Sequence, residues 1–249
     1  MIMKEITTKI NKGVVLKELH GGIRFGTDAL LLSDFASIGA KKGKVLDIVT
    51  GSGVIPLLLL ALGSKAVFAG VEIQKEFFEV ASENSSVNGF SERFSVINAD
   101  ISDYKNLFSK ATFDCVVTNP PYMQKSVGKP NDSYALSVAR REECGGIRLF
   151  CEASSYLLGT GGRFFAVYRP DRLVELLSAM RDNKIEPKKI RFVRPSAKEK
   201  VSLLLIEGKK DAHEGLIYLP DLCQYTDETH KEESEELKSI YSRFDGGNG

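Results

Sequence analysis

The sequence predicts an α/β fold: a seven-stranded, mostly parallel sheet with helices on both faces. Short apolar runs recur along the chain, and most are followed by a segment of helical periodicity, the order of elements in βαβ units. The last two apolar runs have no helical segment between them. We therefore expect an antiparallel hairpin, joined near Pro195 to Lys200, at one edge of the sheet.

The candidate elements follow the chain in this order. Strands are expected near Lys44 to Ile48, Ala66 to Glu72, Phe94 to Asn98, Phe113 to Thr118, Gly162 to Tyr168, Lys189 to Arg194 and Val201 to Glu207. Helices are expected from Thr27, as the capping residue, through Phe35, from Val54 onward, and over Gln74 to Val87, Ile147 to Leu158 and Asp171 to Arg181.

Three regions are expected on this basis. Residues 1–22 carry two weak strand patterns and a Gly-Gly turn, which indicate an N-terminal arm or hairpin. Residues 23–225 form the α/β domain, and residues 226–249 form an acidic tail that we expect to be mobile. Within the domain, Tyr122 to Gly146 is longer than a compact connection needs, which is typical of a functional lid or of disorder.

Composition excludes several classes of protein. The content of 43% hydrophobic and 27% charged residues is that of an ordinary globular protein. The longest apolar run, Val54 to Leu62, contains Pro56 and is too short to cross a bilayer, and no segment resembles a signal peptide, so a cytoplasmic location is expected. The four cysteines form no CxxC pair and are expected to be reduced thiols.

The strand at Lys44 to Ile48 runs into a glycine turn. Thr50, Gly51, Ser52 and Gly53 follow it, and a helix begins directly afterwards. Glycines let backbone approach a ligand closely, and the start of the helix presents free amide groups. This is where α/β sheets bind nucleotides. Pro56 stands where a dinucleotide-binding turn has its third glycine, so a pyrophosphate cradle is disfavoured.

Acidic residues accompany three successive strands near their carboxyl ends. Asp47 lies in the first strand, Glu72 ends the second beside Ile73, and Asp100 follows the third beside Ile101. Glu72 suits the two hydroxyls of a ribose, and Asp100 with Ile101 suits an adenine amine and ring face. Each residue alone is better explained as a solvated strand end; together they predict a nucleotide-type site.

Asn119-Pro120-Pro121-Tyr122 follows the fourth strand. The prolines remove two backbone donors, so the carbonyls of Asn119 and Pro120 can face a cleft. Two acceptors aimed at a conjugated amine localise its lone pair for in-line attack on a methyl group, and Tyr122 can stack on a base. The alternative is an ordinary Pro-Pro loop.

Together these residues resemble the class I methyltransferases that use S-adenosylmethionine (SAM) to modify amino groups. The resemblance implies a Rossmann-like fold and SAM as cofactor. Within that class, residues 20–32 resemble the leading segment of bacterial tRNA adenine-N6 methyltransferases that act beside the anticodon of a valine tRNA, which implies that Phe25, Thr27 and Asp28 close over SAM. The sequence departs at Val49, where such families place a small residue, often glycine.

The activity expected from this resemblance is methyl transfer from SAM to the exocyclic amino nitrogen of adenine in RNA, most simply tRNA near the anticodon. A guanine-N2 RNA methyltransferase and a protein glutamine-amide methyltransferase are the alternatives. A non-catalytic RNA-binding module and a nicotinamide oxidoreductase are further candidates. Net charge is only +1, but Arg163 to Lys200 holds eleven basic against five acidic residues, which favours phosphate contacts as much as a solvated surface. No metal is expected because the three histidines are dispersed, and a monomer is favoured.

Overall fold

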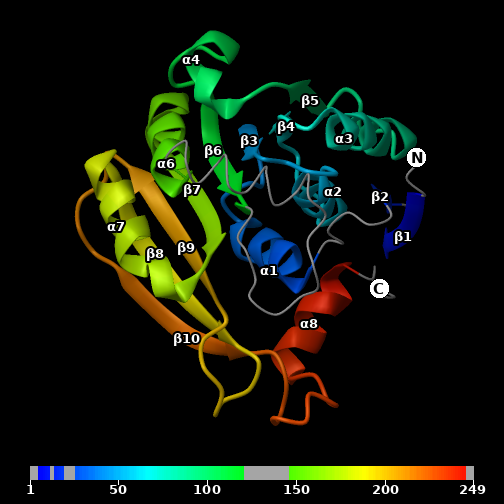
Figure 1. Cartoon of the computed structure of the whole chain (residues 1–249), viewed down its shortest axis with the longest axis vertical. Helices are drawn as coiled ribbons and strands as arrows, with labels where there is room; N and C mark the ends of the chain where they lie inside the picture. The colour runs from blue at the N-terminus through cyan, green and yellow to red at the C-terminus, as the bar shows by residue number, and fades with distance from the viewer. Residues whose placement is uncertain (1–4, 12–13, 20–25, 121–145, 245–249) are drawn as a thin grey trace.

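The structure is a computed structural model of the 249-residue chain, and it describes residues 5–11, 14–19, 26–120 and 146–244. Its centre is a mostly parallel sheet between two layers of helices, which confirms the predicted fold class (Figure 1). Among the described residues, no helix is long and apolar enough to cross a membrane.

The sheet has eight strands rather than the seven expected. Their order is β10-β8-β9-β7-β6-β3-β4-β5, and β9 alone runs antiparallel to its neighbours. The eighth strand, β10, pairs in parallel with β8, so the hairpin of β8 and β9 is not at the edge. The bounds are β3 Lys44–Ile48, β4 Val67–Glu72, β5 Phe94–Asn98, β6 Phe113–Thr118, β7 Leu158–Tyr168, β8 Ile185–Arg194, β9 Leu203–Lys210 and β10 Ile217–Cys223.

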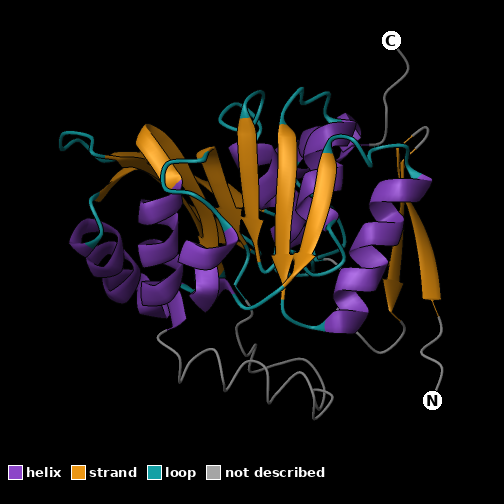
Figure 2. Ribbon diagram, turned by 90° about the horizontal axis from the view of Figure 1, so that it is seen from above, coloured by secondary structure: helices purple, strands orange, loops and turns teal. Residues whose placement is uncertain are grey.

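Both faces of the central strands are buried. In β6, Val116 packs into one apolar cluster, while Cys115 and Val117 pack into the cluster on the opposite face. Side chains alternate across a strand, so continuous apolar runs are what a doubly covered sheet requires. Figure 2 shows the strands as the middle layer between helices.

The helices form two covering layers. One layer holds α1 (Thr27–Ala36), α2 (Val54–Ala61) and α8 (Glu235–Phe244); the other holds α4 (Tyr104–Leu107), α6 (Gly146–Leu157) and α7 (Leu173–Asp182). The helix α3 (Lys75–Val87) packs beside β4 and β5. Short 3₁₀ turns cover Ile101–Asp103 and Pro170–Arg172.

The start of α1 differs from the expectation. Gly26, not Thr27, occupies the N-cap position, and no side chain caps the helix there. Asp28 in the first turn accepts a hydrogen bond from the Ala29 amide at 2.9 Å. A carboxylate in the first turn also complements the positive end of the helix dipole, so Asp28 stabilises the helix start in place of a capping threonine.

The N-terminal residues form a two-stranded sheet. Strands β1 (Glu5–Asn11) and β2 (Val14–Leu19) pair antiparallel. Leu16 of β2 is fully buried in the same apolar cluster as α1 and α2. The hairpin is therefore packed on the α/β domain and does not extend from it as a separate arm.

The C-terminal segment differs most from the expectation. The tail predicted to be mobile contains α8, whose Leu237, Ile240 and Phe244 are buried against the layer of α1 and α2. These residues are spaced three and four apart, so they share one face of the helix. Arg243 also forms an ion pair with Asp34 of α1, and α8 lies beside α1 in Figure 1.

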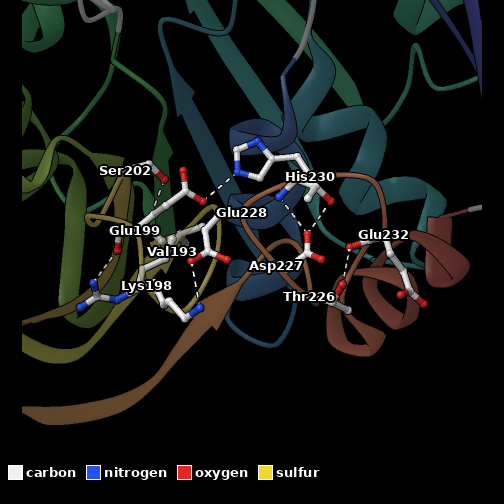
Figure 3. Close-up of polar contacts among 11 residues, drawn as sticks. Val193, Lys198, Glu199, Ser202, Thr226, Asp227, Glu228, His230 and Glu232 are labelled. Carbon is white, nitrogen blue, oxygen red and sulfur yellow. Dashed lines mark hydrogen bonds and ion pairs between the residues drawn. The ribbon is translucent and has the colours of Figure 1, made fainter.

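The segment before α8 is held to the β8–β9 turn. The His230 ring nitrogen Nε2 lies 2.7 Å from the Glu199 carboxylate, and Lys198 pairs with Glu228 at 3.3 Å (Figure 3). The Tyr225 ring stacks on His230 with centroids 4.8 Å apart. Residues 195–202 and 224–234 therefore form one connected region after the carboxyl ends of β8 and β10.

Candidate active site

The predicted site residues gather at one edge of the sheet. Strands β5, β4, β3 and β6 are neighbours and run parallel, so their carboxyl ends meet at the same edge. In the ladders, Ile48 of β3 stands opposite Val71 of β4 and Thr118 of β6. The segments that follow these strands therefore start side by side, at the place where open α/β sheets bind ligands.

The turn after β3 has three residues in the left-handed region of φ. These are Val49 at 58°, Gly51 at 57° and Gly53 at 81°. The Thr50 amide donates to the Val71 carbonyl at 3.1 Å, and the Gly53 amide donates to the Thr50 carbonyl at 2.9 Å. The turn is thus closed on itself and attached to β4.

The two glycines of this turn serve different purposes. A Cβ on Gly53 would lie 2.7 Å from Cε1 of Phe94, so glycine is required there for packing. A Cβ on Gly51 would have no atom of the described residues within 4 Å. Gly51 therefore borders open space, which is what close approach of a ligand to the backbone needs.

Asp47 is buried behind the turn, with 1% of its surface exposed. Its Oδ2 accepts a hydrogen bond from the Thr50 hydroxyl at 2.6 Å, whereas Oδ1 has no hydrogen-bond partner among the described residues. Burial raises the pKa of this carboxyl to about 8, the Thr50 hydrogen bond lowers it, and Glu72 raises it further. A buried carboxylate oxygen without a donor is costly.

Glu72 joins the turn to the end of β4. One carboxylate oxygen accepts from the Gly51 amide at 3.0 Å and the other from the Gln74 amide at 2.9 Å. The side chain is 2% exposed. Glu72 therefore holds the glycine turn against the segment that follows β4.

The residues after β5 extend the same edge. Asp100 caps the short 3₁₀ turn by accepting from the Ser102 amide at 2.8 Å, and Ile101 is buried at 5% exposure. The Ala99 amide donates to the Glu72 carbonyl at 3.1 Å, so this segment is fixed beside β4. Ile73, after Glu72, is 44% exposed and presents an apolar side chain to solvent.

Asn119 lies after β6 and contacts α1. Its Nδ2 donates to the Asp28 Oδ2 at 3.2 Å. A carboxylate can only accept, so this contact places the amide nitrogen toward Asp28 and leaves Oδ1 as the acceptor atom of the Asn119 side chain. Asp28, which the resemblance implies closes over SAM, contacts Asn119 in the structure. Pro120 is buried, and the Thr118 hydroxyl donates to the Ile48 carbonyl at 3.1 Å.

Of the other predicted site residues, the structure describes two and leaves two outside the described ranges. Thr27 is the first residue of α1, and Ser52 is buried in the glycine turn. Phe25 and Tyr122 lie outside the described residues, as do Pro121 and the loop up to residue 145; Gly146, taken as the end of that loop, is the first residue of α6.

Sequence reasoning did not identify two asparagines that support the site. Asn98 donates to the Glu72 and Ile73 carbonyls at 2.8 and 3.1 Å. Asn84 is fully buried in α3 and donates to the Ser52 carbonyl at 2.8 Å. An asparagine in the middle of a helix was the available signal for Asn84, since such residues favour helix ends and turns.

The basic stretch from Arg163 to Lys200 is mostly paired within the protein. Eight of its eleven cations form ion pairs: Arg163, Arg169, Arg172, Arg181, Lys189, Arg191, Arg194 and Lys198. For example, Arg163 and Lys189 share Glu207, and Arg194 pairs with Asp221 at 2.6 Å. This pairing favours the alternative of a solvated surface over a dedicated phosphate-binding one.

The fold and this edge define an α/β protein with a glycine turn bordering open space after β3 and a polar segment after β6, at the place where open α/β sheets bind ligands. A family model described as a methyltransferase domain matches residues 40–201, and the chain belongs to this family.

Two curated relatives and one solved structure are similar to this chain, each over a different share of its length. A tRNA1(Val) (adenine(37)-N6)-methyltransferase of Porphyromonas gingivalis strain W83 is 34% identical over 160 residues, which is 62% of each chain and so less than two thirds of that protein's length. A protein of the same name from Dyadobacter fermentans is 28% identical over 224 residues, or 88% of this chain and 90% of the relative. A predicted O-methyltransferase of Agrobacterium tumefaciens has the same fold, with a TM-score of 0.70 and 18% identity over 88% of this chain and 98% of that one.

Proposed function

We propose that the protein transfers a methyl group from SAM to the exocyclic amino nitrogen of adenine in RNA, with tRNA near the anticodon as the substrate. The observation that carries this proposal is the contact of Asn119 with Asp28. It engages the Asn119 Nδ2, so the atom that Asn119 can offer as an acceptor to a substrate is Oδ1, at the same sheet edge as the open space beside Gly51.

The residues present fit SAM. The open space at Gly51 can take the part of SAM that lies against the backbone, and Glu72 places a carboxylate, the group that suits ribose hydroxyls, at the end of β4 beside this turn. The Oδ1 of Asp47 has no donor among the residues that the structure describes, and the ligand ammonium or its hydrating water would supply one. Asp100 and Ile101 then suit the adenine of the cofactor. When bound, SAM supplies an electrophilic methyl group on a sulfonium sulfur.

The side chains of this chain would prepare the acceptor nitrogen. The Asn119 Oδ1 and the Pro120 carbonyl accept the two hydrogens of the amine, which localises its lone pair and stabilises the positive charge that develops there. Asp28 keeps the Asn119 amide in the required orientation. No strong base is needed, since the nitrogen can lose its proton to water after the new bond has formed.

Adenine in tRNA is favoured over the other acceptors by the names of the relatives. A guanine-N2 acceptor and a glutamine amide have the same delocalised nitrogen and remain the alternatives. A tRNA substrate also agrees with the cytoplasmic location and the monomer expected from the sequence.

Replacing Asn119 by alanine tests the role of its oxygen. We expect Asn119→Ala to leave the SAM dissociation constant within about twofold and to lower methyl transfer by about 100-fold or more, because the lost acceptor acts on the transition state. Calorimetry and single-turnover transfer measure the two quantities. Asn183→Ala is the matched control, since among the described contacts the Asn183 side chain bonds only the Ala179 carbonyl, at the end of α7.

Equal losses of SAM affinity and transfer in Asn119→Ala would show that Asn119 is structural. Calorimetry with NAD on the same sample tests whether the protein is instead a nicotinamide oxidoreductase. Binding of NAD without binding of SAM would contradict the proposed function.

A further inference from the structure

The N-terminal hairpin is attached to α3 by two asparagines. The Asn88 side chain accepts from the Val15 amide at 2.8 Å and donates to the Val15 carbonyl at 2.7 Å. Asn84 repeats this pattern on Lys17, accepting from its amide at 2.8 Å and donating to its carbonyl at 2.9 Å. Each side-chain amide thus replaces the peptide group of a neighbouring strand.

The spacing of these residues explains why a helix can pair with β2. Four residues along a helix rise about 6 Å, and two residues along a strand rise about 6.8 Å. Asn84 and Asn88 are four apart, and Val15 and Lys17 are two apart. The two asparagines therefore match the polar groups on one edge of β2, while β1 pairs with the other edge.

Asn84 and Asn88 differ in the group that accepts the second hydrogen of the side-chain amide. The Nδ2 of Asn84 also donates to the Ser52 carbonyl in the glycine turn at 2.8 Å. On the other side of the same peptide, the Gly53 amide donates to the Thr50 carbonyl. The peptide between Ser52 and Gly53 is therefore held at both ends, directly before the first residue of α2.

We infer that Asn84 is a positioning residue that makes the N-terminal hairpin part of the cofactor site. The inference rests on the proposed SAM binding by the glycine turn. Asn84 is fully buried, and its side chain makes three hydrogen bonds, using both donated hydrogens, that join β2, α3 and the turn. A change in the hairpin is transmitted to the Ser52–Gly53 peptide, which sets the direction of the amides at the start of α2.

The test compares two matched asparagines. Asn84→Ala and Asn88→Ala each release β2 from α3, which hydrogen exchange at residues 14–19 measures. Only Asn84→Ala also releases the Ser52 carbonyl. We expect this variant to raise the SAM dissociation constant about fivefold, the effect of one lost hydrogen bond, and Asn88→Ala to stay within about twofold.

A readout without ligand keeps the test independent of SAM. The carbonyl carbon of Ser52 and the amide of Gly53 should shift by NMR in ligand-free Asn84→Ala and remain as in the wild type in Asn88→Ala. If Asn84→Ala does not fold, Asn84→Asp carries the comparison, because it keeps the volume and the acceptor and loses both donated hydrogens.

Equal effects of the two substitutions on SAM affinity, or unchanged Ser52 and Gly53 resonances in both Asn84 variants, would overturn the inference. Absence of SAM binding by the wild type would instead overturn the proposed function. In that case the ligand-free resonances still decide whether Asn84 couples the hairpin to the turn.

Discussion

Val49 holds a β-branched side chain in the left-handed region of φ, at 58°. This conformation costs an L-residue about 1 to 2 kcal/mol and costs glycine nothing. Glycine is the usual residue in such a turn, so the sequence departure at Val49 stores strain next to the proposed cofactor site.

Because of this strain, we expect the protein to be more stable with glycine than with alanine when either residue replaces Val49, the reverse of the usual order. Val49→Gly should be more stable than Val49→Ala by about 1 kcal/mol, because both lose the side-chain contacts and only glycine relieves the strain. Urea unfolding of the two variants measures the difference. The usual order, with alanine more stable by about 0.5 to 1 kcal/mol, would show that the turn is not left-handed at this residue.

Asp47 predicts a pH dependence of stability. Burial raises its pKa from 3.8 to about 8 in the folded chain, so between these values the folded protein binds a proton that the unfolded chain has lost. The Asp47 contribution to stability is therefore present near pH 4 and is lost as the pH rises toward 8.

The difference between wild type and Asp47→Asn isolates this contribution. Without SAM, the unfolding free energy of the wild type should fall relative to that of the variant from pH 5 to pH 8, by up to about 1.4 kcal/mol per pH unit. Parallel profiles would mean that Asp47 is not the group that titrates.

Residue types could be predicted from the sequence, but several of their contacts could not. Asp47, Glu72 and Asn119 fall at strand ends that the sequence indicates, whereas the contact of Asp28 with Asn119 joins residues 91 positions apart. Strand pairing and helix packing set such contacts. These contacts cannot be predicted from the spacing of residues along the chain.

At the scale of elements, α8 is the clearest departure from the expectation. Its exposed face is strongly charged, which led to the prediction of a mobile tail, yet Leu237, Ile240 and Phe244 are each at most 3% exposed. Their helical spacing was present in the sequence. By contrast, β3, β5 and β6 have the bounds that their sequence patterns predict.

The packing of α8 predicts a large cost for Phe244→Ala. Removing a buried phenylalanine should lower the unfolding free energy by about 3 kcal/mol. Ser239→Ala, on the exposed face of the same helix, should change it by less than about 0.5 kcal/mol. Thermal unfolding of the two variants checks this, and a neutral Phe244→Ala would mean that α8 does not pack on the domain.

The strand β10 could not be predicted with the same ease. It contains Pro220 and Asp221, and Ile217 and Tyr218 are more than half exposed, so its pattern is not that of a buried strand. Proline is tolerated there because β10 is an edge strand, where some amides need no partner.

At the scale of the whole molecule, charges are balanced locally as well as in total. The net charge is +1, and eight cations of the basic stretch are neutralised by carboxylates of the same chain. The basic stretch by itself therefore gives little support for RNA as the acceptor. That assignment depends on the chemistry of the sheet edge and on the similarity to named relatives.

The most direct measurement is mass spectrometry of nucleosides from tRNA treated with the protein and methyl-deuterated SAM. The account predicts deuterated N6-methyladenosine with the wild type and at least about 100-fold less with Asn119→Ala. Label in N2-methylguanosine or in protein glutamine, or the same yield of N6-methyladenosine from Asn119→Ala, would contradict it.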